Sequence, residues 1–269
     1  MNQNFNSYLT GLFEGDGHIS IPKKGNPRFC ITTHEKNEPW LLSIKTNLSN
    51  YGWVRRKRKE RALVLTISNM LGLKLVVNKL NGHFKTPKIE KFQELINWIN
   101  IKENTCIQLL PINYNFDNSW LTGFIEADGC FMIRFTEYKL ISKKKPRCAT
   151  RFSLDQRMFG PTSLSYKPIM ENIANFLKCN LLIINKKKVQ KQYFNITISG
   201  QEKIKGLISY LDQYPLSSSK YLDYLDWKQA YELLQQKEHL IFPNKIKLLK
   251  CKMNNSRLHF IWNHLEEKP

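Results

Sequence analysis

The sequence predicts an α+β protein built from two tandem units, each with the element order α-β-β-α-β-β-α. The first observation behind this prediction is an internal repeat. The segment SYLTGLFEGDGHISI at residues 7–21 recurs as SWLTGFIEADGCFMI at residues 119–133, and the matched positions keep one constant offset. A repeat of this length in an otherwise non-repetitive chain indicates a duplicated unit. The second observation is that the same series of helix and strand patterns follows each copy.

The first element of each unit is a helix, expected over residues 8–15 and 120–127. An Asp-Gly dipeptide ends each helix, and glycine supplies the backbone freedom that a helix exit needs. Small residues lie four apart on one face of each helix, namely Gly11 with Gly15 and Gly123 with Ala127. Such faces let two helices approach closely, so we expect these four residues to form an interface between the halves about a pseudo-two-fold axis.

The later elements follow from hydrophobic periodicity. Alternation with a period of two predicts strands at residues 18–21, 28–32, 130–135 and 151–154. An amphipathic helix comes next in each unit, over residues 39–49 and 167–178. A second hairpin ends in cognate strands at residues 62–67 and 193–198. Two helices then close each half, over residues 69–80 and 88–98, and over residues 201–210 and 221–234.

These elements divide the chain into an N-terminal unit, residues 1–104, and a C-terminal unit, residues 119–269. The segment between them, residues 105–118, contains Pro111 and several asparagines without sustained periodicity, which is typical of a linker. After Gln236 a basic segment with a helical pattern is expected to pack on the second unit.

Composition restricts the class of partner. The chain has 42 basic and 22 acidic residues and a formal charge of +20, which indicates a polyanionic partner such as nucleic acid. No stretch approaches the roughly 20 apolar residues of a membrane span, so we expect no membrane partner. The six cysteines and six histidines show no metal-ligand spacing, which argues against a zinc site or a disulfide framework. Abundant Lys, Asn and Ile, which have A/T-rich codons, suggest an AT-rich genome such as an organelle's.

Basic residues gather at all four expected hairpin turns. They include Lys23, Lys24, Arg55, Lys57, Arg61, Lys139, Arg147, Lys186, Lys188 and Lys191. If the two sheets lie side by side, these turns border one saddle-shaped surface whose width suits a DNA duplex. We therefore expect the turns to contact phosphates.

Between the turns, the open strand faces carry donors, acceptors and small apolar groups. The candidates for base contacts are His18, Ser20, Arg28, Cys30 and Thr32 in the first sheet, and Met132, Arg134, Thr136, Arg151, Ser153, Asp155, Tyr193 and Asn195 in the second. This mixture suits the reading of base edges better than uniform charge would.

The repeated acids, Asp16 and Asp128, each end a helix, where the macrodipole disfavours a carboxylate unless a cation compensates. Packed helices would bring both carboxylates to the floor of the basic groove. Hard oxygen ligands there would bind Mg²⁺, and two or more ions between carboxylates and phosphates suit phosphodiester hydrolysis.

The motifs LTGLFEGDG at residues 9–17 and LTGFIEADG at residues 121–129 resemble the two signature helices of the LAGLIDADG homing endonucleases. Two copies in one chain are similar to the monomeric, pseudo-symmetric branch, and by element order the resemblance covers essentially the whole chain. It implies that Asp16 and Asp128 bind the catalytic metal, with Gly15 and Ala127 beside them at the metal site. No catalytic role is assigned to the other acids of the motifs, Glu14 and Glu126.

The resemblance also implies a basic residue just before the last helix of each half. Lys220 matches this position well, whereas Lys88 follows Pro87 and a more polar helix comes after it. A lysine near the scissile phosphate stabilises developing negative charge or perturbs the attacking water. Gln156 resembles a polar active-site residue of the family. Its counterpart by position is Thr33, a departure that would make the two sites unequal.

The resemblance therefore implies a sequence-specific, Mg²⁺-dependent endonuclease that cuts both strands of double-stranded DNA. It further implies a long asymmetric target, short 3′ overhangs, intron mobility and action as a monomer. Together with the composition this predicts an organellar gene, mitochondrial first, with a chloroplast gene as the alternative. Two alternatives stay open. One is a maturase that binds its host intron RNA, and the other is a DNA-binding module without catalysis. The presence of both acids and both lysines favours the nuclease.

Overall fold

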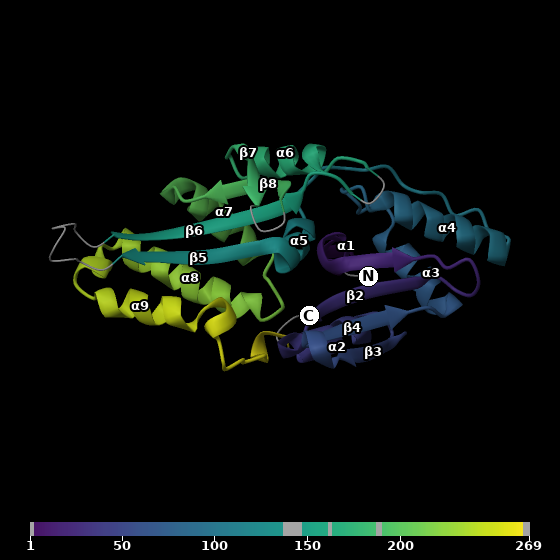
Figure 1. The fold of residues 1–269 in the computed structure, drawn as a ribbon, viewed down its shortest axis with the longest axis horizontal. Coiled ribbons are helices and arrows are strands. Elements are labelled where there is room, and N and C mark those ends of the chain that lie inside the picture. Colours follow the sequence, from purple (N-terminus) through teal and green to yellow (C-terminus); the bar gives the residue numbers. More distant parts are fainter. Residues whose placement is uncertain (1–2, 137–146, 161–162, 187–189, 266–269) are drawn as a thin grey trace.

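The computed structural model describes residues 3–136, 147–160, 163–186 and 190–265. Two four-stranded antiparallel sheets lie on either side of a central pair of helices, α1 and α5 (Figure 1). Their strand orders are β1-β2-β4-β3 and β5-β6-β8-β7, which are the same order used twice. The predicted α+β fold with two tandem units is confirmed.

The first unit contains α1 (Gln3–Asp16), β1 (Gly17–Ser20), β2 (Arg28–His34), α2 (Glu38–Asn47), β3 (Trp53–Lys57), β4 (Ala62–Ile67), α3 (Met70–Leu80) and α4 (Ile89–Glu103). The second contains α5 (Trp120–Asp128), β5 (Gly129–Thr136), β6 (Arg147–Arg157), α6 (Lys167–Phe176), β7 (Leu181–Lys186), β8 (Lys191–Ile198), α7 (Gln201–Gln213), α8 (Lys220–Gln235) and α9 (Pro243–Lys252). Every expected helix and strand is present. The largest differences in extent are at α1, which begins at Gln3, and at β6, which is much longer than expected.

The segment between α4 and α5 contains no helix or strand. Asn100 holds its beginning, because the Asn100 side chain donates to the carbonyl of Ile107 and accepts from the Ile107 amide, each at 2.9 Å. Farther along, the Asn81 amide donates to the carbonyl of Gln108 at 2.8 Å. Asparagine side chains thus take the place of regular secondary structure in satisfying this backbone.

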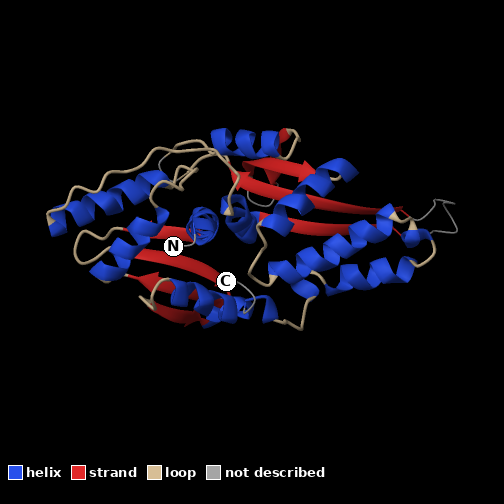
Figure 2. Ribbon diagram, turned by 180° about the vertical axis from the view of Figure 1, so that it is seen from behind, coloured by secondary structure: helices blue, strands red, loops and turns tan. Residues whose placement is uncertain are grey.

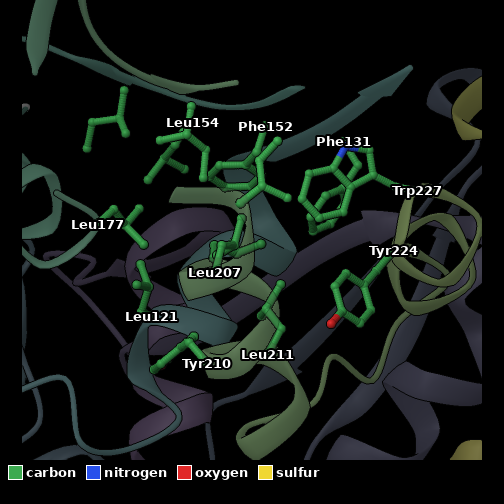
Figure 3. Close-up of a cluster of buried hydrophobic side chains, with 14 of the residues drawn as sticks. Leu121, Phe131, Phe152, Leu154, Leu177, Leu207, Tyr210, Leu211, Tyr224 and Trp227 are labelled. Carbon is green, nitrogen blue, oxygen red and sulfur yellow. The ribbon is translucent and has the colours of Figure 1, made fainter. Parts of the chain in front are cut away.

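Each unit has its own hydrophobic core between one sheet face and the helices that cover it. In the second unit, Phe131 lies 5.3 Å from Phe152 and 5.1 Å from Trp227 between ring centroids. These rings group with Leu207 and Leu211 of α7 in Figure 3. In the first unit, Phe13 of α1 stacks on Phe29 of β2 at 4.8 Å. Helix α5 packs in turn on β5 and β6, so both central helices are fixed to their own sheets as well as to each other.

The two central helices meet at glycine, and they lie next to each other in both views (Figures 1 and 2). A Cβ atom built on Gly11 would lie 1.9 Å from the carbonyl oxygen of Trp120, and one on Gly123 would lie 2.0 Å from that of Tyr8. Nearer the C-terminal ends of the two helices, a Cβ on Gly15 would lie 2.1 Å from the Ala127 Cβ. Glycine at positions 11 and 123 is required because backbone meets backbone there.

The C-terminal segment differs from the expectation in part. Helix α9 packs on α8 and β5, as predicted, with Ile246 and Leu249 buried. The rest is divided between the units: Arg257 pairs with Asp223 and Asp226 of α8, as predicted, whereas Trp262 and Leu265 pack against the core of the first unit, contrary to the prediction. The apolar residues Phe5 of α1 and Ile44 of α2 line the same cleft as Leu265. In the described residues, no helix combines the length and apolarity needed to cross a bilayer.

Candidate active site

The two motif acids are brought together as expected. Asp16 and Asp128 are the last residues of α1 and α5, and a Cβ on Gly15 would lie 3.5 Å from Asp128 Oδ2. Solvent reaches Asp16, yet the surrounding protein raises its pKa to about 6, first by desolvation and second through the charge of Asp128. Burial also raises the pKa of Asp128. Two carboxylates with raised pKa values at one place are a common mark of a functional site.

The two candidate lysines bind the ends of the same helices. Lys88 Nζ donates to the carbonyl oxygens of Phe13 (3.1 Å), Gly15 (2.9 Å) and Gly17 (2.6 Å). Lys220 Nζ donates to the repeat-equivalent carbonyls of Ile125 (3.0 Å), Ala127 (3.5 Å) and Gly129 (2.5 Å). Each ammonium therefore compensates the negative end of a helix and lies beside the acid there. Burial lowers the pKa of Lys88 to about 8 and also lowers that of Lys220.

Glu14, the other acid of the first motif, is fully buried and holds the loop that precedes Lys88. Its carboxylate accepts from the backbone amides of Lys85 (3.0 and 3.1 Å) and Thr86 (2.5 Å). It also accepts from Trp120 Nε1 of the opposite helix at 2.7 Å. Every partner is a donor, so an ionised carboxylate suits the position even though burial raises its pKa.

Glu126 repeats this arrangement in the second half. It accepts from the amides of Ser217 and Ser218 and from the Ser218 hydroxyl, just before Lys220. It also accepts from the Tyr8 hydroxyl of α1 at 3.1 Å. Tyr8 and Trp120 occupy equivalent repeat positions, so each half sends one aromatic donor to the glutamate of the other. Sequence reasoning left both glutamates without a role; their repetition in buried motif helices was the available signal.

Gln156 makes the two sites unequal, as expected from the sequence. Its Nε2 donates to Asp128 Oδ2 at 3.1 Å. Its counterpart Thr33 instead accepts from Asn37 Nδ2 at 2.8 Å. Beside Asp128 a cleft opens between β6 and the β7–β8 hairpin, and Arg157, Lys186 and Lys191 contribute cationic side chains to its lining. Arg157 was not among the residues predicted from the sequence.

The residues at this site fit a divalent cation. Their donors are carboxylate oxygens of Asp16 and Asp128 and the carbonyl oxygens of Gly15 and Ala127, and hard oxygen donors are what Mg²⁺ prefers. The raised pKa values show that the surrounding lysines leave the two carboxylates under-compensated. Each carbonyl oxygen has two lone pairs, so the hydrogen bond from a lysine leaves one available.

The open face of the first sheet presents mostly separate side chains. Residues paired across strands share a face, so His18, Cys30 and Thr66 lie in one row. The predicted contacts that are exposed here are His18, Ser20, Lys23, Lys24, Arg28, Arg55 and Arg61, while Thr32 and Lys57 are half-buried. Arg61 forms an ion pair with Glu35 at 2.8 Å.

Two expectations about this sheet are wrong. Cys30 faces the open side but is buried, because its short side chain lies between His18 and Thr66 on neighbouring strands, and its Sγ is 3.7 Å from Thr66 Oγ1. Arg55 and Lys57 belong to β3 rather than to the turn, which is formed by residues 58–60. Arg55 and Lys57 thus lie along the open face of the strand rather than at the turn.

The second sheet links its open-face side chains to one another. Asn195 is buried, and its amide donates to Ser153 Oγ (3.1 Å) and to Asp155 Oδ1 (2.5 Å). Lys186 pairs with Asp155 at 2.9 Å. Arg151 donates to Thr197 Oγ1 at 3.0 Å, and this hydroxyl donates to Asn195 Oδ1 at 3.0 Å. The amide of Asn195, expected to contact bases, is therefore used within the protein.

The other predicted contacts of the second half are partly placed. Arg134, Thr136 and Lys191 are exposed, and Met132 and Tyr193 are half-buried. Lys186 also lies over the Tyr193 ring, 4.3 Å from its centroid. Lys139 and Lys188 lie outside the described residues, as does the side chain of Arg147, whose backbone begins β6.

The comparisons with known proteins agree on one family. A family model described as LAGLIDADG endonuclease matches residues 9–99 and 121–231. The chain is 32% identical over 244 residues to an uncharacterised cox1 intron-2 protein of Schizosaccharomyces pombe, covering 88% of this chain and 68% of the relative. It is 28% identical over 300 residues to the intron-encoded DNA endonuclease aI3 of Saccharomyces cerevisiae, covering 96% of this chain and 72% of the relative.

Among solved structures, the LAGLIDADG homing endonuclease I-SmaMI bound to cleaved DNA superposes with a TM-score of 0.74 at 21% identity, covering 94% of this chain and 98% of that chain. The same enzyme bound to uncleaved DNA in the presence of calcium ions gives a TM-score of 0.68 at 21% identity, covering 93% and 98%. These likenesses confirm the fold with two signature helices.

Proposed function

The chain belongs to the LAGLIDADG endonuclease family, with one family match in each half, and on this basis we propose that it is a sequence-specific endonuclease that cuts both strands of double-stranded DNA. Each half would cut one strand. The observation that carries the proposal is the pair of carboxylates, Asp16 and Asp128, each flanked by a half-buried lysine, between two sheets with basic open faces.

We propose Mg²⁺ as the cofactor, with two or more ions held by Asp16, Asp128 and the carbonyls of Gly15 and Ala127. When bound, the ions supply a water nucleophile at neutral pH and neutralise charge on the phosphate. The I-SmaMI structure obtained in the presence of calcium ions supports a divalent ion in the family. The protein's own part is positional: Glu14 and Glu126 fix the loops before Lys88 and Lys220, and these ammonium groups supply positive charge beside each reacting phosphate.

Both signature helices lie in one chain, so we propose that the protein acts as a monomer on a long asymmetric target and leaves short 3′ overhangs. The relatives from introns support a role in intron mobility, and the relative encoded in a cox1 intron supports a mitochondrial gene. Host intron RNA remains an additional polyanion that the same basic surfaces could attract, and it belongs in any binding experiment as a competitor.

The test is cleavage of a DNA library that contains the target, in the presence of Mg²⁺, by the wild-type chain and by a double variant, Asp16→Asn with Asp128→Asn. We expect cleavage to be lost while DNA binding persists. Asp117→Asn removes one carboxylate charge, half of the change in the double variant, at an exposed position between the units and serves as the control. Cleavage that survives in the double variant contradicts the assignment of the acids, and tighter binding to intron RNA than to the selected DNA contradicts the proposed substrate.

A further inference from the structure

The edge strands of the two sheets carry opposite chemistry at equivalent positions. The cognate segments 65–68, LTIS, and 196–199, ITIS, align β4 with β8, so that Val64 corresponds to Asn195 and Ala62 to Tyr193. In the first sheet Arg55 pairs with Val64 and Lys57 pairs with Ala62. In the second sheet Leu182 pairs with Asn195 and Ile184 pairs with Tyr193. Two cationic side chains of β3 are thus replaced by two aliphatic side chains of β7.

Leu182 and Ile184 lie on the open face, not on the face that covers the core. Directly paired residues share a face, and Asn195, opposite Leu182, bonds to the open-face residues Ser153 and Asp155. The residue before Asn195 in β8, Phe194, is buried in the core. Leu182 is 49% exposed, and Ile184 is half-buried. An aliphatic pair on an edge strand with one exposed and one half-buried member still presents apolar surface to solvent, and such surface is a liability unless a partner covers it.

The surroundings of this pair identify the partner. The strand that carries it ends at Lys186, which pairs with Lys191 across the hairpin, and the polar network of Ser153, Asp155 and Asn195 lies on its inner side. The aliphatic pair therefore lies within the surface that the proposed function places against DNA, between a basic tip and polar side chains. In the major groove, the apolar group that a base presents is the C5-methyl of thymine, whereas Arg and Lys pair with guanine.

We propose that Leu182 and Ile184 contact thymine methyl groups in the half-site that the second sheet reads, and that Arg55 and Lys57 read guanine at the corresponding distance from the centre of the target. The proposal rests on the proposed function, because it names the base chemistry that the DNA-binding surface selects. It makes the target asymmetric in composition: one half-site requires thymine at positions where the other requires guanine.

The experiment begins with a target selected by cleavage. Two duplexes are then made in which deoxyuridine replaces thymidine in one half-site or in the other, so that the methyl group alone is removed. Binding is measured by fluorescence anisotropy with Ca²⁺ in place of Mg²⁺. We expect deoxyuridine in the half-site of the second sheet to weaken binding about fourfold for each contacted methyl group. Deoxyuridine in the other half-site should have little effect.

The variant Leu182→Ala with Ile184→Ala tests whether these side chains sense the methyl groups. We expect it to bind the unmodified target more weakly and to lose the difference between thymidine and deoxyuridine. Arg55→Ala is the matched control at the equivalent register, and it should keep that difference. Thermal melting of both variants separates a loss of recognition from a loss of fold.

The proposal is overturned if deoxyuridine has no effect, if it acts equally in both half-sites, or if the double variant keeps its sensitivity. It is also overturned if the double variant binds DNA normally but no longer self-associates in sedimentation, which would assign the aliphatic pair to contacts between copies of the chain. Failure of the proposed function is distinct, because the wild-type chain would then select and cleave no target.

Discussion

The first sheet presents its open face as largely separate side chains, whereas the second sheet joins its open face into a hydrogen-bonded network. Beneath the two faces the framework is nearly the same: glycine contacts carbonyl, glutamate holds the lysine loop, and lysine binds the end of the helix. The framework sets where the carboxylates lie, which both strand cuts require. The faces set which bases are read, which needs to differ between the half-sites of an asymmetric target.

The two halves also exchange one aromatic hydrogen-bond donor each. Tyr8 and Trp120 cross the interface to donate to Glu126 and Glu14, so neither half completes its own glutamate site. The two donors differ chemically but have the same role: the Tyr8 phenol in one half corresponds to the Trp120 indole in the other. Both are large rings with a single donor, which is the property that the buried carboxylate needs.

The largest effect should come from adding a methyl group at the symmetric glycine contacts between α1 and α5. Gly11→Ala and Gly123→Ala each place a methyl group about 2 Å from a backbone carbonyl that cannot yield, so each should cost roughly 4 kcal/mol or more of unfolding free energy. Denaturation in urea measures this. Gly206→Ala is the control, because its Cβ meets nothing within 4 Å in helix α7, and it should stabilise the protein by about 0.5–1 kcal/mol. Equal stabilities for all three variants would refute the contact.

A smaller and still symmetric effect is expected at the glutamates. Glu14→Gln and Glu126→Gln turn an amide donor toward groups that are themselves donors, and each should lower the unfolding free energy by about 2–4 kcal/mol. Variants that still fold should cut more slowly the strand served by the lysine of the altered half. A plasmid labelled on one strand at a time reports this, and equal slowing of both strands would indicate a general loss of stability instead.

A change at Gln156 should make the two strand cuts differ in rate without unfolding the protein. Gln156→Ala removes the donor to Asp128, and we expect about a tenfold slowing of one strand cut, so that nicked plasmid accumulates. Thr33→Ala removes an acceptor that serves Asn37 rather than Asp16, and the ratio of the two cutting rates should stay unchanged. Accumulation of nicked plasmid with Thr33→Ala but not with Gln156→Ala would reverse the inferred asymmetry.

The smallest effect concerns pH. The folded protein raises the pKa of Asp16 from 3.8 to about 6, so it holds this proton more tightly than the unfolded chain does. Ionisation therefore costs stability as the pH rises from 3.8 to about 6. Without divalent ions, Asp16→Asn should raise the melting temperature at pH 7 by a few degrees at most, since the side chain is partly exposed, and should leave it unchanged at pH 4. A lower melting temperature at pH 7 contradicts this sign.

The sequence was sufficient for what the repeat and the periodicity encode: the two sheets, the central helices, the glycine faces and the meeting of Asp16 with Asp128. It was insufficient where a residue acts through partners distant in the chain. Glu14 binds amides more than 70 residues away, and no local pattern predicts that pairing. Period-two alternation assigned Cys30 to the open face correctly, but exposure depends on the lengths of neighbouring side chains, which alternation does not report.

Residues 262–265 make a second connection between the two units, beside the start of α1 rather than through the contact between α1 and α5. Trp262 and Leu265 pack on the first unit, while His264 hydrogen-bonds the Ser217 carbonyl of the second at 2.9 Å and lies tilted against Tyr221, 4.5 Å between ring centroids. A chimera that joins the first unit of one relative to the second unit of another would inherit this terminal segment without the apolar residues of α1 and α2 against which it packs. Recombination of half-enzymes to build new specificities must therefore carry matching residues on α1 and α2 together with the foreign second unit.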